Sequence, residues 1–162
     1  MSEQLRARSS CRDAVVSLAI ALAGAGTLAA PARAQERATS DTAGIRQAAL
    51  DYIEGWYEAD PARMSRAIHP ELAKRIVVRD PTNGAAMVRA MGASELVMQT
   101  RRGGGQKIPT AQRRRDVAIL DIYRDMATVK LTSAELVDYL HLARVEGQWR
   151  IVNVLWDMRA DR

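Results

Sequence analysis

Residues 116–158 read DVAILDIYRDMATVKLTSAELVDYLHLARVEGQWRIVNVLWDM, and this stretch decides the fold class. It holds four runs rich in Val, Ile, Leu and Tyr, which favour extended backbone. Short polar turns separate the runs, so neighbouring strands are expected to pair antiparallel as a meander. The four predicted strands are 116–124, 126–132, 136–145 and 148–158.

Both faces of this predicted sheet carry apolar side chains. In the first strand, Val117 and Ile119 point to one face, and Leu120 and Ile122 point to the other. A sheet with one face in water alternates more cleanly between apolar and polar residues. We therefore expect one face to pack on helices and the other on a second copy of the chain, as a homodimer.

The chain before this stretch follows helical periodicity. Apolar residues from Ile45 to Trp56 recur on one helix face, which predicts a helix over 41–59. Asp60 caps a second, short helix, which is expected to end at His69 because a residue before proline leaves helical geometry. Helices followed by strands predict an α+β fold. The other expected elements are a strand at 73–79, a strand or helix at 85–91, a helix at 94–101 and a loop at 101–115.

The first 34 residues have the pattern of a secretory signal peptide. A basic start at 6–12 precedes an uncharged apolar run at 14–30 and the small-x-small site Ala32-Arg33-Ala34. The apolar run is short and weak for a transmembrane helix, which favours a cleaved leader. The alternative is an uncleaved anchor. We expect cleavage after Ala34 and a periplasmic or secreted protein.

Composition narrows the classes of function. The chain has 162 residues, about one domain, with 24 basic and 19 acidic residues and a net charge of +5. One Cys and two His argue against a His/Cys zinc cluster, and we expect no metal and no cofactor. Export argues against a nucleic-acid partner, and a membrane is expected as a partner only through an uncleaved leader. The expected boundaries are a leader at 1–34, a disordered start at 35–40 and a domain at 41–158.

Four segments together carry a family resemblance. They are DYIEGWY at 51–57, IHPELAKR at 68–75, VDYLHL at 137–142 and GQWRIVN at 147–153. In this order and spacing they resemble the nuclear-transport-factor-2-like superfamily, in its putative lumazine-binding branch near the SnoaL-like proteins. The resemblance covers essentially all of 41–158.

The resemblance implies a cone-shaped fold, in which N-terminal helices pack inside a curved antiparallel sheet and a pocket opens at one end. It also implies dimerisation through the sheet. It implies no single activity, because the superfamily includes isomerases, cyclases, dehydratases, ligand carriers and proteins without chemistry. The lumazine in the family name does not identify a ligand.

Three residues are candidates for acid–base chemistry. His69 could move a proton near neutral pH, or it could instead cap a helix carbonyl or pack against Leu72. Asp121 lies on an apolar row, so it is either a pocket base or the partner of Lys130 or Arg144. Tyr139 could donate a proton to a bound molecule.

Further candidates would bind a ligand without reacting. Tyr139 and His141 share one strand face, which lines either the pocket or a dimer interface. Asp138 lies on the opposite face; burial without a partner would raise its pKa, and the simpler interpretation is a solvated carboxylate or one paired with an arginine. The candidate ligand-binding residues are Tyr52, Trp56, His69, Tyr139, His141, Asn153 and Trp156, of which the tryptophans and Tyr52 could instead be core residues.

These features favour an exported domain that binds a small, mostly apolar molecule. The alternative is a cofactor-free isomerase, cyclase or dehydratase with a His or Asp base and a Tyr donor. A third possibility is an interaction module, because Arg113-Arg114-Arg115 in the loop 101–115 could meet an anionic partner. The same loop could equally be a solvated connector.

Overall fold

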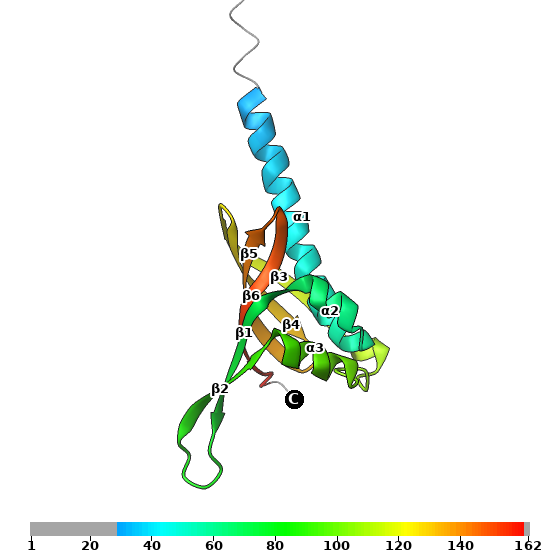
Figure 1. Cartoon of the computed structure of the whole chain (residues 1–162), viewed down its shortest axis with the longest axis vertical. Helices are drawn as coiled ribbons and strands as arrows, with labels where there is room; N and C mark the ends of the chain where they lie inside the picture. Colours follow the sequence, from blue (N-terminus) through cyan, green and yellow to red (C-terminus); the bar gives the residue numbers. More distant parts are fainter. Residues whose placement is uncertain (1–28, 161–162) are drawn as a thin grey trace, which may run out of the picture.

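The computed structural model describes residues 29–160, which combine helices with one six-stranded sheet (Figure 1). This architecture confirms the predicted α+β class. The helices are α1 (Ala29–Glu58), α2 (Pro61–Ala67), α3 (Ala93–Arg101) and the short 3-10 helix η1 (Thr110–Gln112). The strands are β1 (Ile68–Arg79), β2 (Ala86–Gly92), β3 (Arg115–Tyr123), β4 (Met126–Ser133), β5 (Leu136–Val145) and β6 (Gln148–Met158).

The sheet has the strand order β2-β1-β6-β5-β4-β3. From β3 to β6, consecutive strands pair antiparallel, as the predicted meander requires. β1 pairs parallel with β6 and antiparallel with β2, so the sheet is mixed rather than wholly antiparallel. The ambiguous segment 85–91 forms most of β2. β2 and β3 are therefore the two edges of the sheet.

The core lies between α1 and the concave face of the sheet, which bends around this helix (Figure 1). Ile45 and Ile53 of α1 belong to one buried cluster with Val129, Leu140 and Val154 of three neighbouring strands. Each fully buried aliphatic side chain of this kind stabilises the fold by roughly 1.5–3 kcal/mol. The concave face is thus occupied mainly by apolar packing.

The helix α1 begins earlier than the sequence predicts. Residues 35–40 are helical, where the sequence predicts a disordered start. Their Ala, Gln, Glu and Arg residues are good helix formers, and Arg37 lies 3.7 Å from Asp41 and 3.3 Å from Asp125. Residues 1–28 of the predicted leader lie outside the described residues, and cleavage after Ala34 stays a prediction.

The junction of α2 and β1 also differs from expectation. Asp60 caps α2 as predicted, accepting backbone N–H bonds from Ala62 and Arg63. The helix ends before Ile68, and β1 starts there, so His69 lies in a strand and not at a helix end. The helix therefore ends before the predicted His69, and the strand expected at 73–79 begins earlier, at Ile68, which pairs with Ile151 of β6.

Residues 69–72 bulge from this strand. Ile68 pairs with Ile151, and the next paired residues are Ala73 and Asn153. Pro70 has no N–H to donate, which suits a segment that leaves the ladder. The bulge turns His69 away from regular strand geometry.

Candidate functional site

A buried ion pair lies between the concave face and α1. Lys74 Nζ on β1 is 2.7 Å from Asp138 Oδ1 on β5, and the two side chains are 5% and 0% exposed. The hydroxyl of Tyr52 on α1 donates to Asp138 Oδ1 at 3.1 Å and accepts from Lys74 Nζ at 2.5 Å. The Lys74 ammonium also lies 4.7 Å from the ring centroid of Trp156 on β6. We call these four residues the interior cluster.

Strand alternation brings the interior cluster together. Asp138 and Trp156 are direct neighbours across β5 and β6, so their side chains share the concave face. Lys74 is opposite Val154, two positions from Trp156, and therefore faces the same side. Tyr52 reaches them from the buried side of α1.

Burial sets the protonation of this cluster. Burial lowers the pKa of Lys74, and the negative charge of Asp138 opposes that change only in part. Burial also raises the pKa of Tyr52 well above 10.0, and the Asp138 carboxylate raises it further. The Tyr52 hydroxyl therefore keeps its proton at neutral pH, and the Lys74 ammonium gives up its proton more readily than an ordinary lysine.

Two polar atoms of the interior cluster have no hydrogen-bond partner within residues 29–160. They are Asp138 Oδ2, an acceptor, and Trp156 Nε1, a donor, and both are shielded from solvent. Buried polar atoms in proteins are nearly always paired with protein or ordered water. The cluster thus holds one acceptor and one donor whose hydrogen-bonding capacity is unused among the described residues.

His69 lies apart from the interior cluster, in an open groove of about 710 Å³. The groove runs between the start of β1, the start of α3 and the β5–β6 turn. The backbone N–H of Glu71 donates to His69 Nδ1 at 3.1 Å, so the neutral ring carries its hydrogen on Nε2. The apolar side chains that line the groove are Ile68, Pro70, Ala93, Val97 and Val145.

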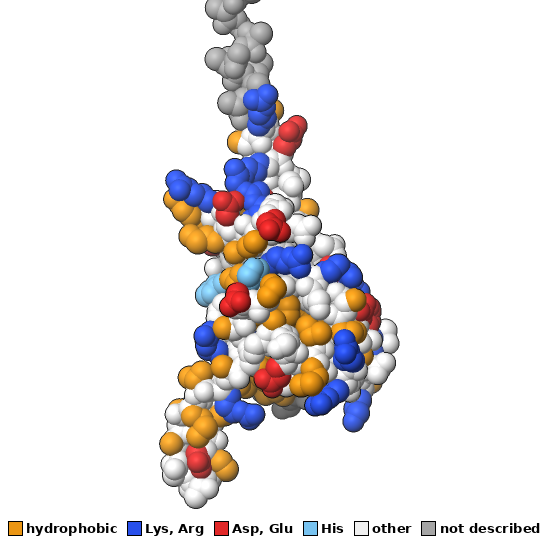
Figure 2. Space-filling model, viewed as in Figure 1, with side chains coloured by type: hydrophobic (Ala, Val, Ile, Leu, Met, Phe, Trp, Pro, Cys, Tyr) orange, Lys and Arg blue, Asp and Glu red, His pale blue; other side chains and the backbone are white. Residues whose placement is uncertain are grey.

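The convex face of the sheet carries a second row of polar and apolar side chains. Because Asp138 faces inward, Tyr139 and His141 face outward, and Tyr139 is 44% exposed. Asn153 lies beside His141, with 3.2 Å between its Nδ2 and the ring Nδ1, and accepts a hydrogen bond from Arg75 at 2.8 Å. Figure 2 shows histidine side chains at the surface among hydrophobic side chains.

The comparison with protein families decides the classification. Residues 40–157 match the family model described as putative lumazine-binding. The chain belongs to this putative lumazine-binding family. The match spans nearly the whole domain expected at 41–158, and it includes all four residues of the interior cluster.

Solved structures show the same fold for this family member. An NTF2-like protein of unknown function from Silicibacter pomeroyi has a TM-score of 0.57 and 14% identity, covering 75% of this chain and 98% of its own. An NTF2-like protein with a cystatin-like fold from Novosphingobium aromaticivorans has a TM-score of 0.57 and 14% identity, covering 81% and 90%. These similarities confirm the expected nuclear-transport-factor-2-like fold. No curated protein matches the chain.

One similar structure is an enzyme. A hexachlorocyclohexane dehydrochlorinase of LinA type 3 from Novosphingobium barchaimii has a TM-score of 0.52 and 10% identity, covering 77% of this chain and 90% of its own. At this identity the similarity shows the fold alone. The chemistry of the present family member has to be argued from its own residues.

The residues predicted for catalysis do not converge in this putative lumazine-binding domain. His69 lies in the open groove, whereas Tyr139 lies on the convex face. Asp121 is exposed on edge strand β3, opposite Thr128. Its expected partner Lys130 instead lies 5.9 Å from the ring centroid of Tyr139, and Arg144, the other expected partner, binds Asp41 and Asp125.

The residues predicted for ligand binding divide among three places. Tyr52 and Trp156 lie in the interior cluster, and His69 lies in the groove. Tyr139, His141 and Asn153 lie on the convex face. For Tyr139 and His141 this is the face expected if they line a dimer interface and not the pocket. Trp56 packs under the glycine-rich turn after α3: its carbonyl accepts a 2.9 Å bond from the Gly105 N–H, and a Cβ at Gly105 would lie 2.7 Å from its indole.

Sequence reasoning left the interior cluster incomplete. The simpler interpretation of Asp138, a solvated carboxylate or one paired with arginine, is wrong, because Asp138 is fully buried and paired with a lysine. The sequence motifs do not mark Lys74 as a site residue. The sequence does hold one signal: Leu72 and Ile76 lie two residues before and after Lys74. In a strand, the three side chains share one face, so the lysine is expected among inward-facing apolar residues.

The basic segment of the loop 101–115 is engaged within the domain. Arg113 donates to the Ile108 carbonyl at 3.0 Å, Arg114 pairs with Asp116, and Arg115 lies 3.3 Å from Glu54.

Within the described part of the chain, no group of three His, Cys, Asp or Glu side chains is placed to hold a metal ion. No helix within residues 29–160 is long and apolar enough to cross a membrane.

Proposed function

We propose that this family member is an exported protein that binds a small molecule at the interior cluster. The observation that carries the proposal is the pair of buried atoms without partners, Asp138 Oδ2 and Trp156 Nε1, beside a buried ion pair. A bound molecule that presents a donor to the carboxylate and an acceptor to the indole would satisfy both. The family description supports a small-molecule ligand.

The energetics of the cluster also support a binding role. Moving a lysine and an aspartate out of water costs several kcal/mol per ion, and apolar residues of similar size often serve stability as well or better. The ion pair of Lys74 and Asp138 is therefore not explained by stability alone. Fixed charges next to the aromatic side chains of Tyr52 and Trp156 suit a flat, partly polar molecule.

Binding is favoured over the acid–base enzyme because of geometry. A general base and a proton donor have to reach the same bound molecule, within hydrogen-bond distance or through one water. His69, Asp121 and Tyr139 occupy the groove, the sheet edge and the convex face, so they do not form such a set. We therefore propose a carrier or sensor of a small molecule in place of an isomerase using these three residues.

We further propose that the protein dimerises through a convex patch, defined here as Val77, Tyr139 and Leu155. Their side chains are 49%, 44% and 50% exposed, and Tyr139 and Leu155 are direct neighbours across β5 and β6. Exposed apolar side chains gathered on a sheet face favour association. The partner that fits an isologous contact is a second copy of the chain.

Native mass spectrometry tests the binding proposal. The full chain is produced with its leader in a Gram-negative bacterium and recovered from the periplasm, beside the double variant Lys74→Met/Asp138→Leu. We expect extra mass on the wild-type protein and none on the variant, because the variant lacks the charged groups. A matched control, Met98→Ser on the exposed face of α3, should keep the added mass. Equal added mass on the wild type and the double variant, or none on the wild type, would overturn the proposal.

Export is tested on the same preparation. We expect the periplasmic protein to begin at Gln35, as read by N-terminal sequencing. The variant Ala34→Arg should remain uncleaved, because the cleavage site requires a small residue there. A periplasmic protein that retains Met1 would contradict the proposed cleavage.

A further inference from the structure

β1 and β2 extend past the rest of the sheet as a two-stranded arm. β1 pairs with β6 only as far as Ile76 and Trp156, so residues 77–88 pair with one another alone. We call residues 77–88 the arm, and Figure 1 shows it projecting beyond the body of the domain. An isolated two-stranded hairpin is marginally stable in water, so an arm of this kind gains from a surface to lie on.

The arm exposes apolar side chains that continue the convex patch. Val77 and Val88 are 49% and 64% exposed, whereas Met87, the neighbour of Val88 in β2, points to the other face of the arm. Val77 and Val88 are opposite each other in the β1–β2 pair, and Val77 is two residues from Arg75, whose side chain reaches Asn153 on the convex face. Exposed apolar side chains on the convex side therefore continue from the body of the sheet onto the arm, with Arg75 between them.

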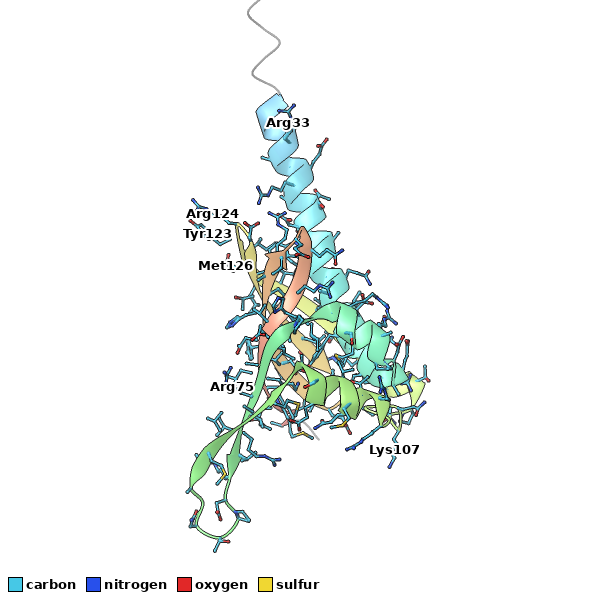
Figure 3. All side chains as sticks on the ribbon, in the orientation of Figure 1. Arg33, Arg75, Lys107, Tyr123, Arg124 and Met126 are labelled. Carbon is cyan, nitrogen blue, oxygen red and sulfur yellow. The ribbon has the colours of Figure 1, made fainter. Side chains whose placement is uncertain are left out.

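The opposite end of the sheet exposes a surface that matches the arm. Leu120, Tyr123 and Met126, at the β3–β4 end, are 54%, 56% and 58% exposed. Figure 3 shows Tyr123 and Met126 at the end of the domain away from Arg75, which lies at the base of the arm. Within one chain, the arm cannot cover these residues.

Two opposite charges complete the match. Arg79 on the arm and Asp121 on β3 are both exposed, and neither side chain has a hydrogen bond or ion pair within residues 29–160. Asp80, next to Arg79, is occupied by the backbone N–H groups of Thr82 and Asn83 in the turn of the arm. The arm thus presents the Arg79 guanidinium outward and β3 presents the Asp121 carboxylate, while Arg124 lies beside Tyr123 at the β3–β4 turn.

We propose that the arm of one copy lies across the β3–β4 end of a second copy. Val77 and Val88 would pack on Leu120 and Tyr123 of the other chain, and Arg79 would pair with its Asp121. The inference rests on the proposed convex-face dimer and specifies how its two sheets are oriented.

Sheet packing permits this arrangement. Two sheets can pack face to face with their strands crossed near a right angle. If the two-fold axis lies between the sheets and runs diagonally to their strands, the arm of each copy reaches the β3–β4 end of the other. Packing arm on arm would instead bring Arg79 against its own copy, and like charges in contact disfavour association.

A charge exchange tests the contact by sedimentation velocity of the full mature chain. Arg79→Glu and Asp121→Arg should each weaken the dimer about tenfold, because each sets like charges together. The double variant Arg79→Glu/Asp121→Arg should recover most of the wild-type affinity. Val88→Ser, which lies on the arm outside the convex patch, should also weaken the dimer about tenfold, whereas Met98→Ser should not. All these side chains are exposed, so circular dichroism should show unchanged folding.

The outcomes separate the arm from the dimer itself. If Leu155→Asp produces monomers and the arm variants leave the dimer unchanged, the convex-face dimer stands and the arm contact is overturned. If the charge exchange fails to restore affinity, the pairing of Arg79 with Asp121 is overturned. A wild-type protein that is monomeric throughout overturns both, and leaves the small-molecule proposal to its own test.

Discussion

Lys74 and Asp138 form an ion pair inside the domain, with 2.7 Å between Nζ and Oδ1 and almost no exposed surface on either side chain. They come from strands that are separated by β6 in the sheet, and their sequence separation is 64 residues. Among residues 29–160, the second carboxylate oxygen of Asp138 has no hydrogen-bond partner, and the rings of Tyr52 and Trp156 lie beside the Lys74 ammonium. This combination is the basis of the proposed binding site.

The ion pair should respond differently to single and double replacement. Asp138→Leu leaves the Lys74 ammonium buried without a counter-charge, and we expect it to lower the free energy of unfolding by about 3–5 kcal/mol. Lys74→Met/Asp138→Leu removes both charges and should come within about 1 kcal/mol of wild type, or exceed it. Chemical denaturation measures both values. A double variant as unstable as Asp138→Leu would show that the charges themselves support the fold.

Tyr52 should make stability depend on pH in the alkaline range. Its folded pKa is raised well above the unfolded value of 10.0, first by burial and then by Asp138. The folded state therefore keeps a proton that the unfolded state loses, so stability from Tyr52 is fully present below pH 10 and falls as the pH rises above it. We expect a shallower alkaline loss in Tyr52→Phe, measured by urea denaturation at successive pH values. Parallel curves for wild type and Tyr52→Phe would contradict the raised pKa.

The glycine turn after α3 should be sensitive to a methyl group. Gly104 has φ +44°, and a Cβ there would lie 2.5 Å from the Trp56 carbonyl oxygen. Gly84 in the arm has φ +73° and no atom within 4 Å of its would-be Cβ, so it controls for backbone strain alone. We expect Gly104→Ala to cost about 1–3 kcal/mol more than Gly84→Ala because of overpacking. Equal losses in thermal or chemical denaturation would show that the turn relaxes around the methyl group.

The convex patch should control the oligomeric state. Leu155→Asp puts a charge in the centre of the proposed interface, and we expect it to convert dimers to monomers in sedimentation or light scattering. Met98→Asp changes an equally exposed apolar residue on α3 and should leave the dimer intact. Dissociation by Met98→Asp, or persistence with Leu155→Asp, would move the interface off the sheet.

The fold could be predicted largely because its signals are local. The runs and turns of 116–158 define four strands within a few residues of their observed ends, and Asp60 with Pro61 marks the start of α2. The start of β1 was missed because His69-Pro70 signals the end of a helix. Pairing of Ile68 with Ile151, more than 80 residues away, decided the strand instead.

The candidate site was less accessible to sequence reasoning. Tyr52 and Trp156 could be proposed because amphipathic aromatic residues suit either a pocket or a core. The sequence shows that Asp138 is unusual, but it does not identify Lys74 as the partner. β1 joins the meander by parallel pairing with β6, and no short turn in the sequence indicates that pairing. The face occupied by Tyr139 and His141 depends on the curvature of the sheet, which a single strand pattern does not encode.

The most direct test of the binding site is the NMR signal of the Trp156 indole N–H. The three tryptophan side chains give three such signals, assigned by Trp→Phe variants, and Trp149 serves as an internal reference because its N–H donates to Asp41 at 3.2 Å. The probe is the small-molecule fraction released by denaturing the periplasmic protein, added back to refolded, ligand-free protein. We expect the Trp156 signal to shift downfield as its N–H gains an acceptor, and the Trp149 signal to stay. A shift of Trp56 or Trp149 alone, or no shift at all, would contradict binding at the interior cluster.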